Sequence, residues 1–170
     1  MSLRNDATLT RLAREISLNR PFADHSEAAL LPYVWTWQRM EQVGREFFEG
    51  FDLTGAQFDV LMILADYPGR AFKQHELAKI LLVNRATAGT VLERMERKEL
   101  IAREADADDR RAMRVTITRH GRQVVDHVKP RYYALIKKLL GGEDEKTLRQ
   151  VIAFCDRLRD NVGRLQPGKE

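Results

Sequence analysis

The sequence predicts a mainly α-helical fold built around a pair of closely spaced helices and a β-hairpin. Apolar residues recur at helical spacing over residues 73–81 and again over 84–98, with only two residues between the segments. Over residues 113–118 the apolar period changes to strict alternation, as in a strand with one buried face. This order predicts a winged helix-turn-helix with a two-stranded β wing, flanked by N- and C-terminal helices that form a dimerisation layer.

The first 26 residues are predicted to form a polar N-terminal arm. Leu9, Leu12 and Ile16 give it one short amphipathic stretch, which Pro21 ends. Two helical turns are too few to stay folded alone, so the arm must lie against another surface or fray.

Residues 27–50 are strong helix formers, with Pro32 near the start, where proline is tolerated. The apolar side chains of this helix occupy more than one face: Tyr33, Val34, Trp37, Met40, Val43, Phe47 and Phe48. A helix that is apolar on two faces needs two partners, such as its own domain and a second subunit.

Two residues are predicted to cap the helices that follow. Thr54 precedes a helix that Pro68 and Gly69 end, and Asn84 precedes the second helix of the close pair. In that second helix the apolar residues Ala88, Val91, Leu92 and Met95 share one face. Helical geometry then turns the opposite face outward, namely Arg85, Ala86, Gly89, Thr90 and Glu93.

The outward face suits nucleic acid, because the major groove of B-DNA admits one α-helix. Arg85 and Thr87 lie in the first turn, where side chains and free backbone N–H groups reach bases or phosphates. Arg94 and Arg97 flank the far side, suited to phosphates or to nearby acids.

The loop 106–111 joins the strands 100–105 and 113–118, and it carries Arg110 and Arg111 at its tip. A guanidinium on a narrow finger is what insertion into a minor groove needs. The alternative is that both arginines pair with Asp106, Asp108 and Asp109 on a solvated turn. Two arginines beside a helix-turn-helix pattern favour DNA.

The C-terminal third is predicted to form two more helices. Thr118 caps the first, Pro130 should kink it or end one segment, and Gly141 and Gly142 end it before a last helix over 144–164. The expected organisation is an arm (1–26), a helical dimerisation region (27–53 with 119–170) and a DNA-binding domain (54–118).

Composition permits this interpretation and excludes several others. The 170 residues carry a net charge of +4, which is compatible with DNA but does not require it. No apolar run is long enough to span a bilayer, and the start lacks a signal-peptide core. One cysteine suits a reducing compartment, so we expect a cytoplasmic protein without membrane contact.

An enzyme or a metal protein is not expected. Asp106, Asp108 and Asp109 lack the glycine and the distal glutamate of a calcium loop. His120 and His127 share a helical face, but the spacing is a weak zinc signal. With no phosphate-cradling glycine loop and no ordered catalytic triad, the sequence predicts neither catalysis nor a cofactor.

From about residue 51 to 122 the chain resembles the MarR-type regulators of antibiotic resistance and aromatic catabolism. The similar segments are LTGAQFDVLMIL, HELAKILLVNRATAGTVLERMERKELI, DADDRRAMRVTIT and TRHG. The resemblance implies a homodimer that binds a palindromic operator in double-stranded DNA. It also implies repression that is relieved by a small, often phenolic or carboxylate, ligand.

The resemblance also assigns residues. The implied DNA-binding set is Asn84, Arg85, Thr87, Gly89, Thr90, Arg94, Arg110 and Arg111. Within it Arg110 would enter the minor groove, and Arg94 would bridge to Asp109 of the wing. Gly89 and Thr90 stand where the family often has a hydroxyl residue and an arginine, and Glu99 replaces a usual glycine. If position 99 needs a positive φ, the glutamate is strained by about 1 kcal/mol.

Two further points stay open. Trp35 and Arg39 are candidate ligand-binding residues, with Arg39 as counter-ion to a carboxylate, although core and dimer interface are the simpler assignment. The alternative function is a winged-helix protein-interaction module without DNA binding, against which the basic wing argues.

Overall fold

A computed structural model describes residues 7–106 and 112–165 of the chain. The chain divides into two compact units, Met1–Val125 and Asp126–Glu170, and each is described by itself. The expected arm, dimerisation and DNA-binding regions divide the chain differently, because they anticipate a second subunit, and they stay a prediction.

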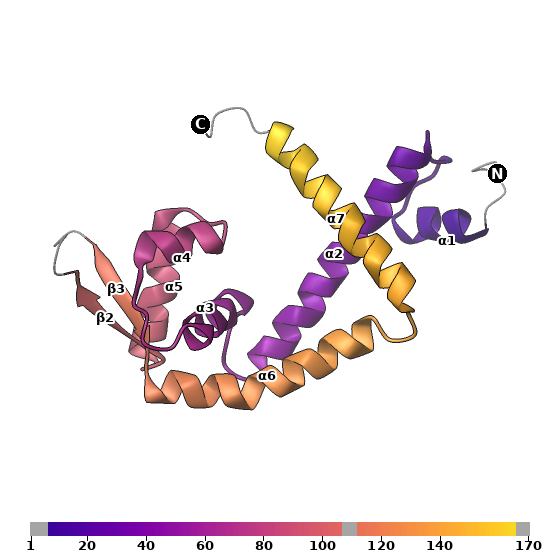
Figure 1. The fold of residues 1–170 in the computed structure, drawn as a ribbon. Coiled ribbons are helices and arrows are strands. Elements are labelled where there is room, and N and C mark those ends of the chain that lie inside the picture. Colours follow the sequence, from indigo (N-terminus) through magenta and orange to yellow (C-terminus); the bar gives the residue numbers. More distant parts are fainter. Residues whose placement is uncertain (1–6, 107–111, 166–170) are drawn as a thin grey trace. The chain divides into compact units, whose positions relative to one another are not determined.

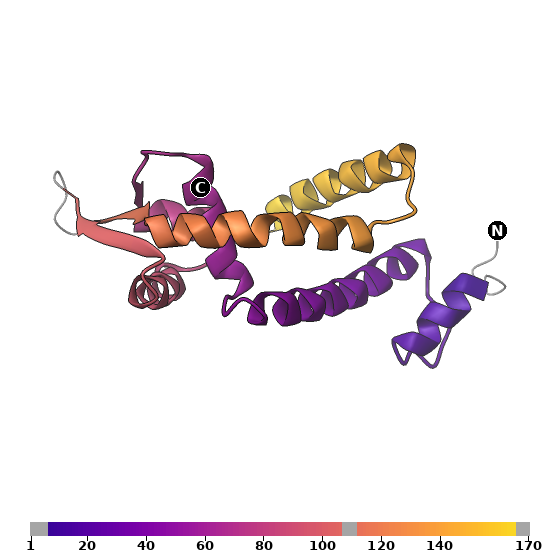
Figure 2. The ribbon, with the colours of Figure 1, turned by 90° about the horizontal axis from the view of Figure 1, so that it is seen from below.

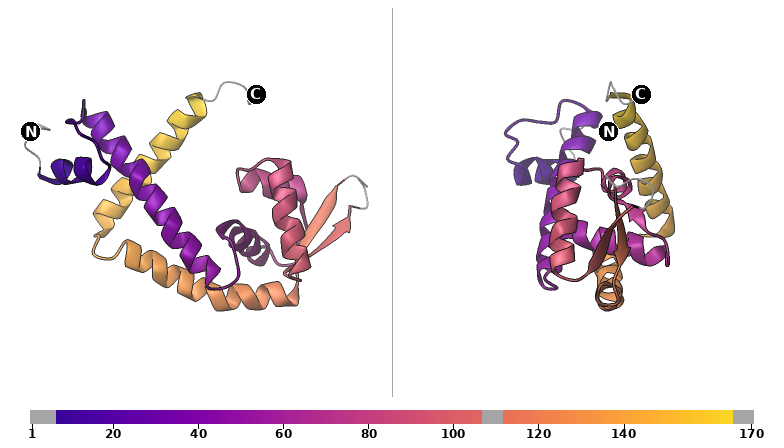
Figure 3. Two further views of the ribbon diagram at one scale, coloured as in Figure 1. Left: turned by 180° about the vertical axis from the view of Figure 1, so that it is seen from behind. Right: turned by 90° about the vertical axis from the view of Figure 1, so that its left-hand side faces the viewer.

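Within the described residues the fold is mainly helical and contains the expected helix-turn-helix and wing (Figure 1). The elements in chain order are α1 (Ala7–Glu15), α2 (His25–Glu49), α3 (Gly55–Asp66), β1 (Phe72–Lys73), α4 (Gln74–Ile80), α5 (Arg85–Arg97), β2 (Ile101–Ala105), β3 (Met113–Ile117), α6 (Arg119–Leu139) and α7 (Glu145–Leu165). Helices α4 and α5 are the close pair, and β2 and β3 form the hairpin, which projects beyond these helices (Figures 1 and 3).

Within the described residues a third, short strand, β1, joins the predicted two-stranded wing. Its order is β1-β3-β2, with both pairs antiparallel. Phe72 of β1 lies opposite Val115, which in turn lies opposite Arg103 of β2. Two residues are too few to show alternation, so β1 leaves no periodic signal in the sequence.

The core of the first unit is centred on α3. Phe58, Leu61 and Leu64 of this helix are almost inaccessible to solvent. The other fully buried large side chains of the unit are Val60, Leu77, Leu92, Met95 and Val115. The predicted cap is confirmed as a capping box, in which the Gln57 backbone N–H donates to the Thr54 hydroxyl and the Thr54 backbone N–H donates to the Gln57 side chain.

Pro32 lies deeper in its helix than expected, and Pro130 does not end its helix, so the alternative of a kink at Pro130 stays a prediction. Helix α2 begins at His25 behind an Asp24 cap, so Pro32 lies within the helix and not near its start. Pro32 is buried, and its position in the helix interior has no backbone N–H to donate. Helix α6 does not end at Pro130 but continues to Leu139 (Figure 2).

Two helices, α2 and α7, expose several large apolar side chains to solvent. On α2 these are Leu30, Tyr33, Val34, Trp37, Met40 and Val43. On α7, which buries none of its residues, they are Val151, Ile152, Phe154, Val162 and Leu165. Each helix therefore presents a surface suited to a further partner. No helix in the described ranges has the length and apolarity needed to cross a bilayer.

Candidate nucleic-acid interface

The recognition helix α5 begins at the residue that the sequence predicts. The Asn84 carboxamide oxygen accepts the Thr87 backbone N–H at 2.8 Å, and this cap fixes the first turn. The preceding turn contains Leu82 with φ 55°, and its side chain is 91% exposed. The cap and the tight turn together set the direction in which α5 leaves α4.

The two faces of α5 are those expected. Ala88, Leu92 and Met95 are fully buried, and Val91 is half-buried. The exposed side chains include four of the predicted site residues, namely Arg85, Thr87, Thr90 and Arg94. The Thr90 hydroxyl donates to the Ala86 carbonyl at 3.2 Å, and Gly89 is half-buried. The structure thus gathers Arg85, Thr87 and Thr90 on the solvent-exposed part of α5.

Arg94 and Arg97 lie beside the α2–α3 connection, a relation that the sequence did not indicate. With Lys98 they line a cavity of about 480 Å³ whose other lining residues are Glu49, Asp52, Leu53, Thr54 and Gln57. The Lys98 ammonium is 2.9 Å from the Asp52 carboxylate and also donates to the Asp52 carbonyl. The C-terminal end of α5 is therefore fastened to the loop that follows α2.

The base of the wing holds two acidic side chains next to basic ones. Asp106 is only 5% exposed, and its carboxylate lies 3.5 Å from the Lys73 ammonium. Arg103 of β2 approaches Glu96 of α5 at 3.5 Å. Asp106 is thus buried at the wing base and does not belong to a solvated turn. The partner Lys73 lies 33 residues earlier in the chain, so no local sequence pattern indicated this ion pair.

The wing tip lies outside the described residues. Arg110 and Arg111, with Asp108 and Asp109, belong to 107–111. The predicted minor-groove role of Arg110 and the bridge from Arg94 to Asp109 therefore stay predictions.

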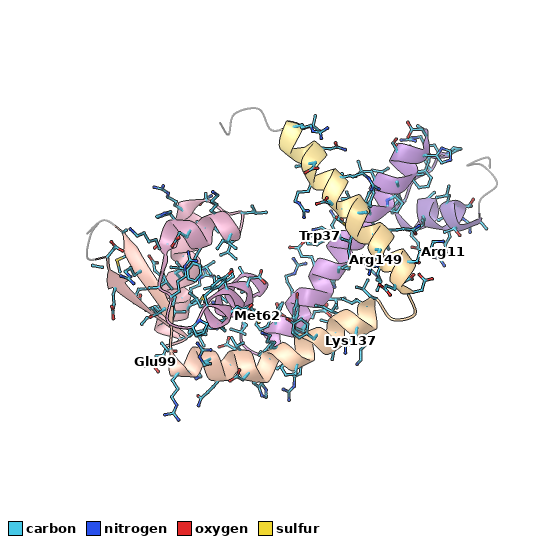
Figure 4. The ribbon with its side chains drawn as sticks, in the orientation of Figure 1. Arg11, Trp37, Met62, Glu99, Lys137 and Arg149 are labelled. Atoms are coloured by element: carbon cyan, nitrogen blue, oxygen red, sulfur yellow. The ribbon has the colours of Figure 1, made fainter. Side chains whose placement is uncertain are left out.

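Position 99, at the corner between α5 and β2, has the positive φ that would strain a glutamate: Glu99 has φ 56° (labelled in Figure 4). Its backbone N–H donates to the Glu96 carbonyl at 2.8 Å, and its own carbonyl accepts the Thr118 hydroxyl at 2.6 Å. The same hydroxyl accepts the Gly121 backbone N–H at 2.9 Å, so Thr118 caps α6 as predicted. One threonine thereby joins the end of α5 to the start of α6.

The start of α4 is held by an acidic side chain. Glu76 accepts the Lys73 backbone N–H at 2.7 Å and lies 3.1 Å from the Arg70 guanidinium. The Lys73 hydrogen bond, with smaller help from Arg70, lowers the pKa of Glu76. Arg70 also lies over the Phe72 ring, 4.2 Å from its centre. These contacts fix the backbone on both sides of Gln74.

Trp35 and Arg39, the candidate ligand residues, are brought together on α2. The Arg39 guanidinium carbon lies 5.3 Å from the centre of the Trp35 ring. Trp35 is half-buried and Arg39 is exposed. Their role toward a ligand stays a prediction. Across the ranges 7–106 and 112–165, no group of three acidic, histidine or cysteine side chains is placed to hold a metal ion.

The chain is similar to known regulators over most of its length. Residues 51–112 match the MarR family model. Transcriptional regulator HosA of Escherichia coli is 32% identical over 104 residues, which cover 59% of this chain and 76% of HosA. The HTH-type transcriptional repressor YetL of Bacillus subtilis is 25% identical over 135 residues, which cover 78% of each chain.

Solved structures share the fold. The MepR–DNA complex of S. aureus superposes with a TM-score of 0.71 and 25% identity, covering 76% of this chain and 94% of MepR. AbsC, a MarR family regulator of Streptomyces coelicolor, gives a TM-score of 0.78 at 19% identity, covering 87% of this chain and all of AbsC. The latter likeness bears on the fold alone. The chain belongs to the MarR family, and it is a DNA-binding transcriptional regulator and not an enzyme.

Proposed function

We propose that the protein is a homodimeric repressor that binds a palindromic operator and is released by a small aromatic or phenolic ligand. The observation that carries the DNA-binding part is the division of α5 into a buried face and an exposed one. Ala88, Leu92 and Met95 anchor the helix, which leaves Arg85, Thr87 and Thr90 free to enter a major groove.

Each predicted site residue has a role in this proposal. Asn84 holds the first turn, while Arg85, Thr87, Gly89 and Thr90 face bases or phosphates. Arg94 contacts a phosphate or the wing. Arg110 enters the adjacent minor groove, and Arg111 contacts the backbone beside it.

The dimer is supported by the exposed apolar side chains on α2 and, separately, on α7. Covering them with a second copy would remove this apolar surface from water. Two copies of α5 related by a two-fold axis would then enter successive major grooves about 34 Å apart. A palindromic operator follows from that symmetry.

Two observations support repression and its relief by a ligand. The relative YetL is named a transcriptional repressor. The Trp35–Arg39 pair offers an aromatic face beside a guanidinium, which suits an aromatic carboxylate. A ligand that binds one spacing of the α5 helices better than another by about 2 kcal/mol shifts operator affinity roughly thirtyfold.

A mobility-shift assay with the protein's own upstream DNA, at two salt concentrations and with competitor DNA, tests operator binding. A specific complex should weaken steeply with salt yet outlast the competitor. Arg110→Ala should weaken the complex and flatten its salt dependence, because the variant has one positive charge fewer to neutralise the DNA phosphates. Arg149→Ala, which removes an exposed arginine paired with Glu145 on α7, serves as control. Absence of any shift would favour the protein-interaction module instead.

Titration of the same complex with sodium salicylate tests the ligand part. Salicylate should release the DNA, and Arg39→Ala should raise the concentration needed for half release. Unchanged release in this variant would exclude Arg39 from the ligand site, and no release would exclude salicylate-like ligands.

A further inference from the structure

A side chain from α4 occupies the space that Gly89 leaves on the recognition helix. A Cβ atom at position 89 would lie 3.2 Å from Nε2 of Gln74. Gly89 shares one row of α5 with Arg85 and Glu93, since these residues are spaced four apart. The Gln74 amide therefore lies against the helix where a residue-89 side chain would otherwise begin.

The position of Gln74 is fixed by its neighbours. It is the first residue of α4, directly after Phe72 and Lys73, which pair with β3. Phe72 is buried, and the Lys73 N–H is bonded to Glu76. The side chain therefore starts from a backbone that its neighbours hold in place.

The Gln74 amide remains available for a ligand. Gln74 is half-buried, and among the described residues its amide makes no hydrogen bond. An amide offers one acceptor and two donors. Adenine presents the matching acceptor N7 and donor N6 in the major groove, whereas a phosphate presents acceptors only.

We propose that Gln74 is a specificity-determining residue: its amide reads an adenine in the major groove in place of the side chain that position 89 lacks. The inference rests on the proposed insertion of α5 into that groove. It adds a second helix to the base-reading surface, because Gln74 belongs to α4 and not to α5.

Selection of binding sites from randomised DNA tests the proposal. The wild-type protein should prefer adenine at one position in each half-site. Gln74→Ala should reduce that preference roughly 5- to 100-fold at this position alone. Gln74→Glu should move the preference toward cytosine, because a carboxylate accepts from cytosine N4. Gln150→Ala on α7 is the matched control, and thermal melting of each variant verifies the fold.

Three results would overturn it. If the Gln74→Ala variant loses the same affinity for every DNA sequence, and its binding depends less steeply on salt, Gln74 contacts a phosphate and not a base. An unchanged preference would place Gln74 outside the interface. Failure of the wild-type protein to select any motif would overturn the proposed operator binding and this inference with it.

Gly89→Ala provides an independent measurement, because the added Cβ displaces the amide by a few tenths of an ångström. It should alter selection at the same base as Gln74→Ala, and its effect there should vanish when Gln74 is already alanine. Additive effects of the two substitutions would show that positions 74 and 89 act separately and would contradict the proposal.

Discussion

Glu99 adopts a backbone conformation that favours glycine, at the corner between α5 and β2 (Figure 4). A side chain in the left-handed region costs about 1–2 kcal/mol, whereas glycine adopts it freely. Among the described residues the exposed carboxylate makes no hydrogen bond or ion pair, and the hydrogen bonds of the corner use the backbone of residue 99.

We therefore expect Glu99→Gly to raise the free energy of unfolding by about 1 kcal/mol, part of the relief being offset by the greater entropy of unfolded glycine. Urea denaturation measures the change. Glu99→Ala is the control, since alanine keeps the Cβ and hence the strain. Equal stability of the glycine and alanine variants would contradict the strain at this residue.

Gly121 has the opposite requirement, because no Cβ fits there. A Cβ atom at 121 would lie 2.1 Å from the Leu100 carbonyl oxygen and 3.0 Å from Cγ1 of Ile117. The first obstacle is backbone and cannot rotate away.

We expect Gly121→Ala to lower the free energy of unfolding by about 1–3 kcal/mol or more. Gly163→Ala in α7 is the comparison, because its Cβ would meet nothing within 4 Å of the single chain. That change should gain up to about 1 kcal/mol from helix propensity. Similar thermal unfolding of both variants would show that α6 can move away from Leu100.

At the scale of elements, the cap of α5 links stability to binding. Asn84→Ala removes the acceptor of the Thr87 N–H and should cost about 1 kcal/mol of stability. Operator affinity should fall too, because the loosened turn carries Arg85 and Thr87. Asn84→Ser retains a capping oxygen and should restore most of both. A serine variant as weak as alanine would mean that the Asn84 amide itself touches DNA.

The connection from the arm to α2 should respond to acid. Glu27 accepts hydrogen bonds from Arg20 and from the Ala23 N–H at 2.6 Å, and these, the Arg20 bond first, lower its pKa from 4.5 to about 2. Because the pKa of Glu27 is lower in the folded protein than in the unfolded chain, its ionised carboxylate stabilises the fold. This contribution is complete above the unfolded pKa of 4.5 and is lost as the pH falls toward 2.

Unfolding measured from about pH 6 to about pH 2.5, a range that covers most of the shift in the Glu27 pKa, should therefore show a steeper loss of stability for the wild type than for Glu27→Gln. The glutamine cannot titrate, so its curve lacks the Glu27 contribution. Parallel curves for the two proteins would show that the Arg20–Glu27 pair does not stabilise the fold.

Long periodic elements could be predicted from sequence, whereas short or tertiary features could not. The apolar stripe of α5 and the alternation of β3 specify both the element and its exposed face, so Arg85 and Thr90 lie exposed as predicted, whereas Gly89, which was also expected outward, is half-buried. Strand β1 has no period to read, and the start of α2 depends on the Asp24 cap. The Gln74–Gly89 contact joins residues from two helices, so no local pattern indicates it.

For the whole molecule, the exposed apolar surface of α2 predicts assembly. Trp37 is 57% exposed, and Trp37→Asp would place a charge in any interface that covers it (Figure 4). Light scattering after size exclusion should give twice the 19.7 kDa of one chain for the wild type and close to one chain for the variant.

Tyr67→Ala is the matched control, because this ring is similarly exposed, at 53%, but lies outside α2. It should keep the mass of the wild type. A wild-type mass of one chain, or a Trp37→Asp variant that stays dimeric, would remove α2 from the proposed interface.

The contact at Gly121 has a mechanical consequence. Helix α6 is continuous from this contact to Leu139, and its first turn is clamped by the Thr118 hydroxyl and by the Leu100 backbone. Because the joint leaves no room for an added atom, we expect the first turn of α6, the start of β2 and the last turn of α5 to move together. A displacement of the first turn of α6 would therefore reach the backbone between α5 and β2 directly, at the root of the DNA-reading surface.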